Sequence, residues 1–345
     1  MKIAHIVWGM STGGIETMLT DIIEIQSKNN NVCLITINNI TDSEMLKRIP
    51  ANVSYYNCQR RVKSKNPFPI IKLNFFIWKE QFDIVHLHYA DIAKLLFVPV
   101  LKVCTIHSLG VSIKYHKRFK AIYAISKAVN KEWKNQGIET ILIENGIPIE
   151  AIKEKTSWKN EEPIHIVQVS RLEQKRKAQD LLIEAVLHLN SRKKIKIHLI
   201  GEGPDRKLLE DKVAESHLGD IIVFEGLKSR DWLYNNLCIF DLYVHPARSE
   251  GFGLTVAEAC AAMLPVIVSE NDGPFEILEN GTLGMTFKNG DVHDLAKKID
   301  IFLDKGYDMS LLEKARKKVL LSYNIASTAN KYLENYNILL NSSDN

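Results

Sequence analysis

The sequence lacks the features of several protein classes. Its five cysteines are an odd number without a C-x-x-C pair, so neither a disulfide framework nor a zinc site is predicted. No apolar run reaches the roughly 18 residues of a membrane-spanning helix, and residues 1–8 turn polar too soon for a signal peptide. We therefore expect a soluble cytoplasmic protein, attached at most to the inner face of the cell membrane.

Several ligand-binding motifs are missing as well. The glycine-containing loop at residues 9–16 has neither the G-x-G-x-x-G spacing of a dinucleotide fold nor the G-K-[ST] ending of a phosphate loop. A tight turn and a phosphate contact are therefore both open for Gly13 and Gly14. The chain also has no D-x-D motif, so we expect neither a metal ion nor another cofactor.

The composition is that of an ordinary globular protein, with 46% hydrophobic and 25% charged residues. A length of 345 residues favours two domains. Residues 1–150 carry 19 Lys and Arg against 12 Asp and Glu, a balance of +7, while the remainder is mildly acidic. The basic half indicates an anionic partner or membrane surface, although an ordinary solvated surface would look the same.

Short β-rich runs alternate with helical patterns along the whole chain, which is typical of parallel βαβ units. The expected strands are residues 2–8, 31–37, 53–56, 83–88, 103–107, 121–126, 140–144, 164–169, 195–200, 221–224, 239–245, 266–269 and 284–287. A charged stretch at residues 148–162 interrupts the pattern. This predicts an α/β fold of two doubly wound, Rossmann-like domains facing across a cleft, with ligands at the carboxyl ends of the strands. The domains would be residues 1–150 and 163–325, followed by a helix at residues 326–345 that packs back on the first domain.

The segment from His245 to Cys260 carries the clearest functional pattern. It combines a strand end, a glycine-containing loop with Glu250, and a helix from about Leu254 that contains Glu258. Backbone amides at the start of this helix would face an anion; they belong to Phe252, Gly253 and Leu254. Carboxylates accept hydrogen bonds from sugar hydroxyls, and a buried Glu258 would need a partner. A ligand with phosphate and polyol parts fits this pattern.

Two cations follow the first strand of the second half. Arg171 ends that strand, and Lys177 lies just before the next helix. Fixed cations at a strand end suit a diphosphate through charge-assisted hydrogen bonds. Lys175 and Arg176 are more easily interpreted as part of a solvated basic loop.

Together these segments resemble a retaining glycosyltransferase of the GT-B fold, in glycosyltransferase family 4. The similarity covers nearly the whole chain. It rests on Gly13-Gly14 with Glu16, His107, residues 124–127 and 144–147, Ser170-Arg171-Leu172 with Lys177, the segment at 200–204 that contains Gly201, and Glu250 to Glu258. The usual Lys-Gly pair is Lys177-Ala178 here, which leaves Lys175 as an alternative to Lys177.

The resemblance implies that Arg171 and Lys177 hold a nucleotide diphosphate and that Gly13, Gly14 and Gly201 lie in the donor site. Glu258 would bind the ribose, while Glu250 and His107 would position the transferred sugar and support charge. The implied reaction moves a sugar with retention of configuration from a UDP- or GDP-type donor to a glycan or lipid-linked acceptor, as in cell-surface polysaccharide synthesis. The alternatives are a GT-B epimerase, a phosphorylase, or a sugar-nucleotide sensor without turnover.

The remaining histidines and basic clusters have plainer interpretations. His86, His88, His165 and His198 alternate with apolar residues in expected strands and are interpreted as structural, with lining of the cleft as an alternative for the first two. Basic clusters at 60–65 and 114–120, with the apolar stretch 70–78, indicate contact with anionic lipid. Because no nucleic-acid-binding motif is present, no nucleic-acid partner is expected.

Overall fold

A computed structural model describes residues 1–11, 13–158, 161–190 and 194–342. The chain divides into two compact units, each described by itself below. Unit 1 comprises Met1–Gly146 and Ile325–Asn345, and unit 2 comprises Ile147–Asn324. Small parts of the expected linker and of the expected final helix, residues 159–160 and 343–345, lie outside the described residues.

Within its described residues, unit 1 is built on a parallel sheet of seven strands in the order β3-β2-β1-β4-β5-β6-β7. The strands are β1 (Lys2–Val7), β2 (Asn31–Asn38), β3 (Ser54–Arg60), β4 (Ile84–Leu87), β5 (Lys102–Ile106), β6 (Ala121–Ala124) and β7 (Ile141–Leu142). The helices are α1 (Gly14–Gln26), α2 (Ser43–Lys47), α3 (Phe68–Glu80), α4 (Lys127–Asn135) and α13 (Ile325–Asn341), with short 3₁₀ helices η1 (Ala90–Leu95) and η2 (Ile113–Arg118).

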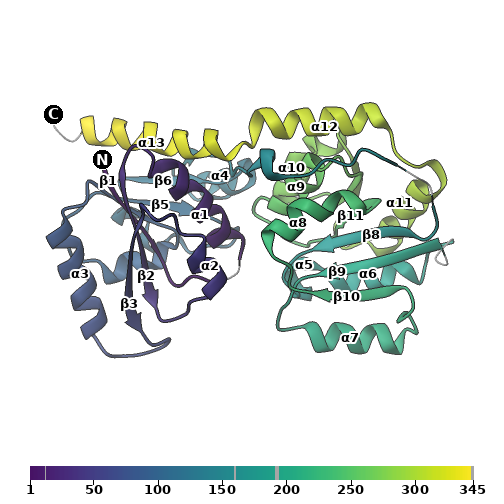
Figure 1. Ribbon diagram of the computed structural model, residues 1–345, viewed down its shortest axis with the longest axis horizontal. Coiled ribbons are helices and arrows are strands. Elements are labelled where there is room, and N and C mark those ends of the chain that lie inside the picture. Colours follow the sequence, from purple (N-terminus) through teal and green to yellow (C-terminus); the bar gives the residue numbers. More distant parts are fainter. Residues whose placement is uncertain (12, 159–160, 191–193, 343–345) are drawn as a thin grey trace. The chain divides into compact units, whose positions relative to one another are not determined.

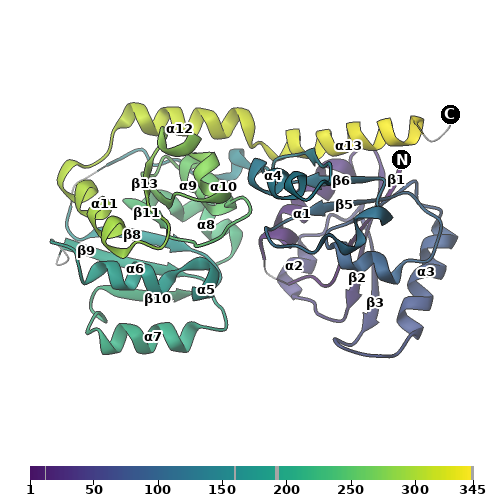
Figure 2. The same cartoon turned by 180° about the vertical axis from the view of Figure 1, so that it is seen from behind.

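The apolar strands of unit 1 form its core because both faces of a parallel sheet are covered by helices. Ile3 and Ile6 of β1 are fully buried. Helices α1 and α13 pack together over the sheet (Figures 1 and 2). Tyr332 and Tyr336 of α13 are buried, so the final helix completes the core of unit 1 although it is remote in sequence.

Unit 2 repeats the architecture with a parallel sheet that, in the described ranges, has six strands in the order β10-β9-β8-β11-β12-β13. The strands are β8 (Ile164–Val169), β9 (Ile195–Ile200), β10 (Ile222–Gly226), β11 (Leu242–His245), β12 (Val266–Ser269) and β13 (Met285–Phe287). The helices are α5 (Gln174–Lys177), α6 (Gln179–Val186), α7 (Arg206–Glu215), α8 (Arg230–Asn236), α9 (Leu254–Ala261), α10 (Asp272–Ile277), α11 (Val292–Lys305) and α12 (Met309–Ser322). Its core joins β8, β9 and β11 to α6 and α11.

These two sheets confirm the predicted pair of doubly wound α/β, Rossmann-like folds. Three strands differ most from their predicted limits. Strand β3 continues to Arg60, β7 has only two residues, and residues 237–239 form a single 3₁₀ turn before β11. Asp241 follows this turn and accepts hydrogen bonds from Lys155 Nζ at 3.1 Å and from the His165 amide at 2.9 Å. Because these bonds fix the backbone at Asp241, the strand begins only at Leu242.

Among the described residues, the search for a bilayer-spanning segment found no helix of sufficient length and apolarity.

Candidate active site

Lys177 and Glu250 meet at the carboxyl end of the unit 2 sheet. Lys177 ends α5, and its Nζ donates to Oε2 of Glu250, which lies in the loop between β11 and α9. His245 Nε2 lies 3.6 Å from the same oxygen. Burial alone raises the pKa of Glu250, but Lys177 and His245 outweigh it and hold that pKa well below its usual range. Glu250 is therefore ionised at neutral pH.

The two candidate lysines differ in position. Lys177 is half-buried and paired with Glu250, whereas Lys175 is exposed. Arg171 is also exposed just after β8, and its carbonyl accepts a bond of 2.7 Å from Gln179 Nε2. The structure thus brings Lys177, and not Lys175, to the carboxylate of Glu250 in the 245–260 segment.

Ala178 explains why a glycine is usual after the lysine. Its backbone is left-handed, with φ of +53° and ψ of +38°, at the junction of α5 and α6. Side chains disfavour this conformation by roughly 1–2 kcal/mol, a cost that glycine avoids. Here the Ala178 amide donates to the Gln174 carbonyl at 3.0 Å, and the fully buried methyl group packs in the core. Although Ala178 stands where a glycine is usual, the ion pair between Lys177 and Glu250 still forms.

The loop before α9 is held close to α10 by glycines. Gly253, at the N-cap of α9, has φ of +95°, and a Cβ there would lie 2.9 Å from Pro274 Cγ. A Cβ on Gly273 would lie only 2.3 Å from Cα of Phe252. This packing fixes the start of α9 at Leu254, as predicted, and with it the amides of residues 252–254 at a helix N-terminus that favours anions.

Glu258 lies within α9 and its side chain is fully buried. Arg230, at the start of α8, donates from Nη2 to Oε1 of Glu258, and its Nε donates to the Tyr234 hydroxyl at 3.0 Å. The sequence correctly indicated that a buried Glu258 needs a partner, but it did not identify Arg230. The signal was weak because Arg230 lies 28 residues earlier in a different element.

Close backbone contacts join the loops after β8 and β9. A Cβ on Gly201 would lie 2.0 Å from the Ser170 carbonyl oxygen, and one on Gly203 would lie 2.2 Å from that of Leu172. The Leu172 amide donates to the Glu202 carbonyl at 3.0 Å. Because Gly201 has no side chain, the loops after β8 and β9 can pack backbone against backbone.

An ion pair that the sequence patterns do not predict stabilises the loops at the carboxyl end of the same sheet. Arg248 binds Asp180 with two bonds of 2.9 and 2.8 Å, which ties the loop after β11 to the first turn of α6. Asn271 and Asn289 both donate to the Arg248 carbonyl at 3.0 Å. Such bidentate pairs fix geometry as well as energy, so Arg248 positions the loop that carries Glu250.

In unit 1, Gly13 caps α1 and lies against Glu16. A Cβ on Gly13 would lie 2.6 Å from Glu16 Oε2, and the Tyr89 hydroxyl donates to Glu16 Oε1 at 3.1 Å. Burial raises the pKa of Glu16. Gly14 begins the helix, so both predicted glycines stand at the N-terminus of α1.

His107 follows β5 directly at the carboxyl edge of the unit 1 sheet. Its Nε2 lies 3.0 Å from Nδ1 of His88. Burial lowers the pKa of His107 to about 3. At neutral pH His107 is therefore uncharged. It can form a hydrogen bond, but it lacks the positive charge that would support a developing negative charge.

The paired Rossmann-like sheets, with a lysine–carboxylate pair beside a helix N-terminus, are the architecture of a GT-B glycosyltransferase. Residues 12–151 match the family model Glycosyltransferase Family 4, and residues 149–319 match Glycosyl transferases group 1. The chain belongs to this family of glycosyltransferases.

Individual relatives agree with this assignment. The chain is 31% identical over 149 residues to the GtfA subunit of UDP-N-acetylglucosamine–peptide N-acetylglucosaminyltransferase of Streptococcus parasanguinis, covering 43% of this chain and 29% of the relative. It is 24% identical over 285 residues to N-acetyl-alpha-D-glucosaminyl L-malate synthase of Bacillus anthracis, covering 74% of each. The fold resembles the crystal structure of Anabaena HepE with UDP and glucose, with a TM-score of 0.82, 20% identity and coverage of 97% and 99%.

The curated relatives with the strongest local similarity are matched only in part. The alignments span 29%, 32% and 34% of the lengths of three of them. The similarity therefore supports the class of enzyme, while the donor and the acceptor are matters for proposal.

Proposed function

We propose that this enzyme transfers a sugar, with retention of configuration, from a UDP- or GDP-type donor to a glycan or lipid-linked acceptor. The observation that carries the proposal is the Lys177–Glu250 pair beside the N-terminus of α9. It combines a cation and helix amides for a diphosphate with an ionised carboxylate for sugar hydroxyls. The UDP in the HepE structure and the UDP-sugar in the name of the streptococcal relative favour UDP as the first nucleotide to test.

The proposed roles follow the chemistry of each side chain. Lys177 and Arg171 would bind the diphosphate, Glu258 the ribose, and Glu250 the transferred sugar. Gly13 and Gly14 would present helix amides to phosphate, and neutral His107 would hydrogen-bond a sugar hydroxyl. Because Lys177 already binds Glu250, donor phosphate and carboxylate would share one ammonium group, which links donor binding to sugar placement.

The proposed chemistry is a front-face displacement. The bond between the anomeric carbon and the donor phosphate oxygen breaks, and the acceptor oxygen forms a new bond on the same face. The departing phosphate oxygen takes the acceptor proton, so no enzyme nucleophile is required. Lys177, Arg171 and the α9 amides would stabilise the leaving nucleoside diphosphate electrostatically.

We further propose that this stabilisation needs no metal ion. Turnover should then persist in excess EDTA, measured by release of nucleoside diphosphate. A matched reaction with added Mg²⁺ serves as the control. Activity that disappears in EDTA and returns with Mg²⁺ or Mn²⁺ would show that a metal takes part.

Transfer is tested first with a panel of sugar nucleotides in a thermal-shift assay. The donor that stabilises the protein is then incubated with glycan and lipid-linked acceptors, while nucleoside diphosphate release and product formation are followed. The anomeric configuration of the product, determined by NMR, decides retention against inversion. Donor binding without release on any acceptor would favour a sensor, and a conversion of the free sugar nucleotide would favour an epimerase.

We also propose that unit 1 contacts an anionic membrane surface in the cytoplasm, which would place the enzyme near a lipid-linked acceptor for polysaccharide synthesis. Helix α3 presents Phe68, Ile71, Phe75 and Trp78, each more than half exposed, on one face. Lys72 and Lys79 are exposed beside this stripe. An apolar aromatic face flanked by lysines suits the headgroup region of an anionic bilayer.

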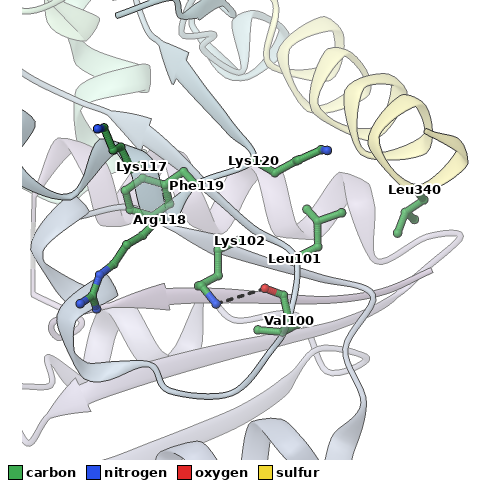
Figure 3. Close-up of a pocket in the computed structure, with 8 residues that line it drawn as sticks. All are labelled: Val100, Leu101, Lys102, Lys117, Arg118, Phe119, Lys120 and Leu340. Carbon is green, nitrogen blue, oxygen red and sulfur yellow. Dashed lines mark hydrogen bonds between the residues drawn. The ribbon is translucent and has the colours of Figure 1, made fainter. Parts of the chain in front are cut away.

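A basic pocket of about 490 Å³ in unit 1 provides a second surface that suits anionic groups. It is lined by Val100, Leu101, Lys102, Lys117, Arg118, Phe119, Lys120 and Leu340, as Figure 3 shows. Lys102 turns inward and donates to the Val100 carbonyl at 3.2 Å, whereas Lys117 and Lys120 are exposed. Because Lys102 begins β5, this pocket lies at the amino edge of the sheet, away from His107 at the carboxyl edge.

A further inference from the structure

Three buried or half-buried histidines form a continuous hydrogen-bonded chain across adjacent strands of unit 1. His5 lies in β1, His88 follows β4 and His107 follows β5. The nitrogen–nitrogen distances are 3.0 Å from His5 Nδ1 to His88 Nε2 and 3.0 Å from His88 Nδ1 to His107 Nε2. At the inner end, His5 Nε2 lies 2.8 Å from Oε1 of Gln26, the last residue of α1.

The amide oxygen of Gln26 gives this chain a direction. An oxygen can only accept, so His5 Nε2 carries the proton and donates to it. Neutral His5 then has an unprotonated Nδ1, which accepts from His88 Nε2. By the same step, His88 Nδ1 accepts from His107 Nε2. The outer end is therefore a His107 ring with its proton on Nε2 and a free lone pair on Nδ1.

The rings are uncharged, as this proton order requires. Burial lowers the pKa of His5 to about 4 and that of His107 to about 3, and it lowers the pKa of His88 well below the usual value. One proton per ring means that His5 and His88 each donate once and accept once along the chain, and that His107 donates once. The tautomer that Gln26 selects at His5 therefore determines the tautomer of His88 and, through it, that of His107.

His86 braces the chain without belonging to it. Its ring stacks on His88 with centroids 4.4 Å apart and an interplanar angle of 22°. Its two nitrogens are occupied by the Tyr336 hydroxyl at 2.6 Å and by Thr105 Oγ1 at 2.7 Å. Tyr336 belongs to α13, so the final helix helps to hold His88 in line with His107.

We propose that Gln26, His5 and His88 are positioning residues that fix His107 as the Nε2-protonated tautomer, so that Nδ1 accepts a hydrogen bond from a hydroxyl of the sugar or acceptor. This assignment rests on the proposed role of His107 in sugar transfer. The side chain that would touch the substrate is His107 alone, and the other three act through it.

Ring nitrogens of His5, His86 and His88 also lie within 4.8 Å of one another, as ligands of one metal ion would. The hydrogen bonds above already occupy these nitrogens. A divalent ion there would have to displace these hydrogen bonds. We therefore assign these histidines to the hydrogen-bonded chain and not to a metal site. The metal content of the purified protein is measured as part of the test.

The direct test is NMR of the full chain labelled with ¹⁵N at histidine, recorded without substrates. Two-bond couplings within each ring identify the protonated nitrogen. We expect Nε2-protonated neutral rings for His5, His88 and His107. A proton on Nδ1 of His107, or a stoichiometric metal ion bound to the cluster in the purified protein, would overturn the proposal. This result does not depend on finding a donor or acceptor.

A matched pair of variants at His88 tests the consequence for catalysis. Asparagine can place an oxygen near the Nδ1 position and keep the acceptor for His107, whereas glutamine reaches toward the Nε2 position and keeps only the contact with His5. We expect His88→Gln to lower kcat about tenfold, the worth of one hydrogen bond in the transition state, with the KM for donor unchanged. His88→Asn should stay within about threefold of the parent.

Equal losses of kcat in His88→Asn and His88→Gln, with both proteins folded, would mean that His88 only fills space and would contradict the proposal. If no sugar transfer is found at all, the same pair is compared by NMR. His107 should then remain a single Nε2-protonated tautomer in His88→Asn and become a tautomer mixture in His88→Gln. Identical His107 spectra in the two variants would overturn the proposed positioning.

Discussion

At the scale of single residues, the ion pair between Lys177 and Glu250 is the central feature. In the proposed donor site, it would let two side chains 73 residues apart serve one ligand. The lysine would supply charge for a phosphate, and together with His245 it keeps the carboxylate ionised. A change in either partner therefore alters both the charge and the geometry of the site.

The two lysines of the α5 segment provide a matched comparison. Lys177→Ala should weaken binding of UDP by roughly 1.5–3 kcal/mol, the worth of a charged hydrogen bond. Lys175→Ala removes the same charge from an exposed position and should change the affinity by less than about 0.5 kcal/mol. Calorimetric titration measures both. A larger loss for Lys175→Ala would transfer the phosphate role to that residue.

The two carboxylates should separate sugar from nucleotide. Glu250→Gln should depress kcat more than it weakens UDP binding, since UDP contains no transferred sugar. Glu258→Gln should weaken UDP itself by about 1–3 kcal/mol if its carboxylate binds the ribose. Product affinities and initial rates at saturating donor keep the two effects apart.

Folding controls matter most for Glu258, because it is fully buried and bound by Arg230. Circular dichroism and thermal melting should accompany both variants. Arg230→Lys, which keeps the charge but not the guanidinium geometry, is the companion variant. The assignment of the pair is reversed if Glu250→Gln loses UDP affinity while Glu258→Gln retains it.

Residue-level prediction from sequence had a clear physical limit. Glu250, Gly253 and Leu254 lie within one contiguous segment, so spacing alone indicated a helix start next to a carboxylate. Arg230 and the Arg248–Asp180 pair depend on which loops fold together, and no local pattern records that. His86 and His88 are interpreted from the sequence as structural, with lining of the cleft as the alternative, because alternation shows burial but not hydrogen-bond partners.

At the scale of secondary structure, apolar strands alternating with amphipathic helices were enough to predict both sheets. Strand ends were less predictable where a polar anchor decides them, as Asp241 does before β11. Helix α3 shows the opposite situation. Its sequence contains enough apolar residues for a buried helix, yet Phe75 and Trp78 lie on its exposed face.

That exposed face predicts membrane binding by α3. Replacing Phe75 and Trp78 together with serine should reduce cosedimentation with vesicles containing anionic phospholipid about tenfold or more, because each aromatic would bury its side chain in the interface. Leu321→Ser is the control, since Leu321 is equally apolar and 74% exposed but lies on α12 of unit 2.

Both variants should hydrolyse the donor, or transfer from it to a water-soluble acceptor, at the parental rate, because none of the three residues belongs to the proposed site. Neutralising Lys72 and Lys79 should weaken binding to anionic vesicles and leave binding to neutral vesicles unchanged. Parental cosedimentation of the Phe75 and Trp78 double variant would remove α3 as the membrane contact.

At the scale of the whole molecule, the two units should respond differently to acid because they bury different titratable groups. Unit 1 holds four histidines, His5, His86, His88 and His107, whose pKa values are all lowered by burial. Unit 2 holds two with lowered pKa values, His165 and His245. Its ionised Glu250 has a lowered pKa, so the stability from that group is present above about pH 4.3 and is lost only below it.

A histidine whose folded pKa is lowered stabilises the fold above its unfolded pKa of about 6.5, and this contribution is lost as the pH falls toward the folded value. For His5, with a folded pKa of about 4, the loss at pH 5 amounts to about 2 kcal/mol. Glu16, whose pKa is raised, acts in the opposite direction but is a single group. Unit 1 should therefore lose stability before unit 2 between pH 6.5 and 4.

Hydrogen exchange with mass spectrometry, corrected for the intrinsic pH dependence of exchange, measures each unit separately. Moving from pH 7 to pH 5 should accelerate exchange in β1, β4 and β5 by more than in β8 and β11. His5→Gln removes one of the neutral rings and should reduce this acid sensitivity in unit 1 by about 2 kcal/mol. If β8 and β11 lose protection first, the prediction is wrong, because the histidine chain would then not control the acid response of unit 1.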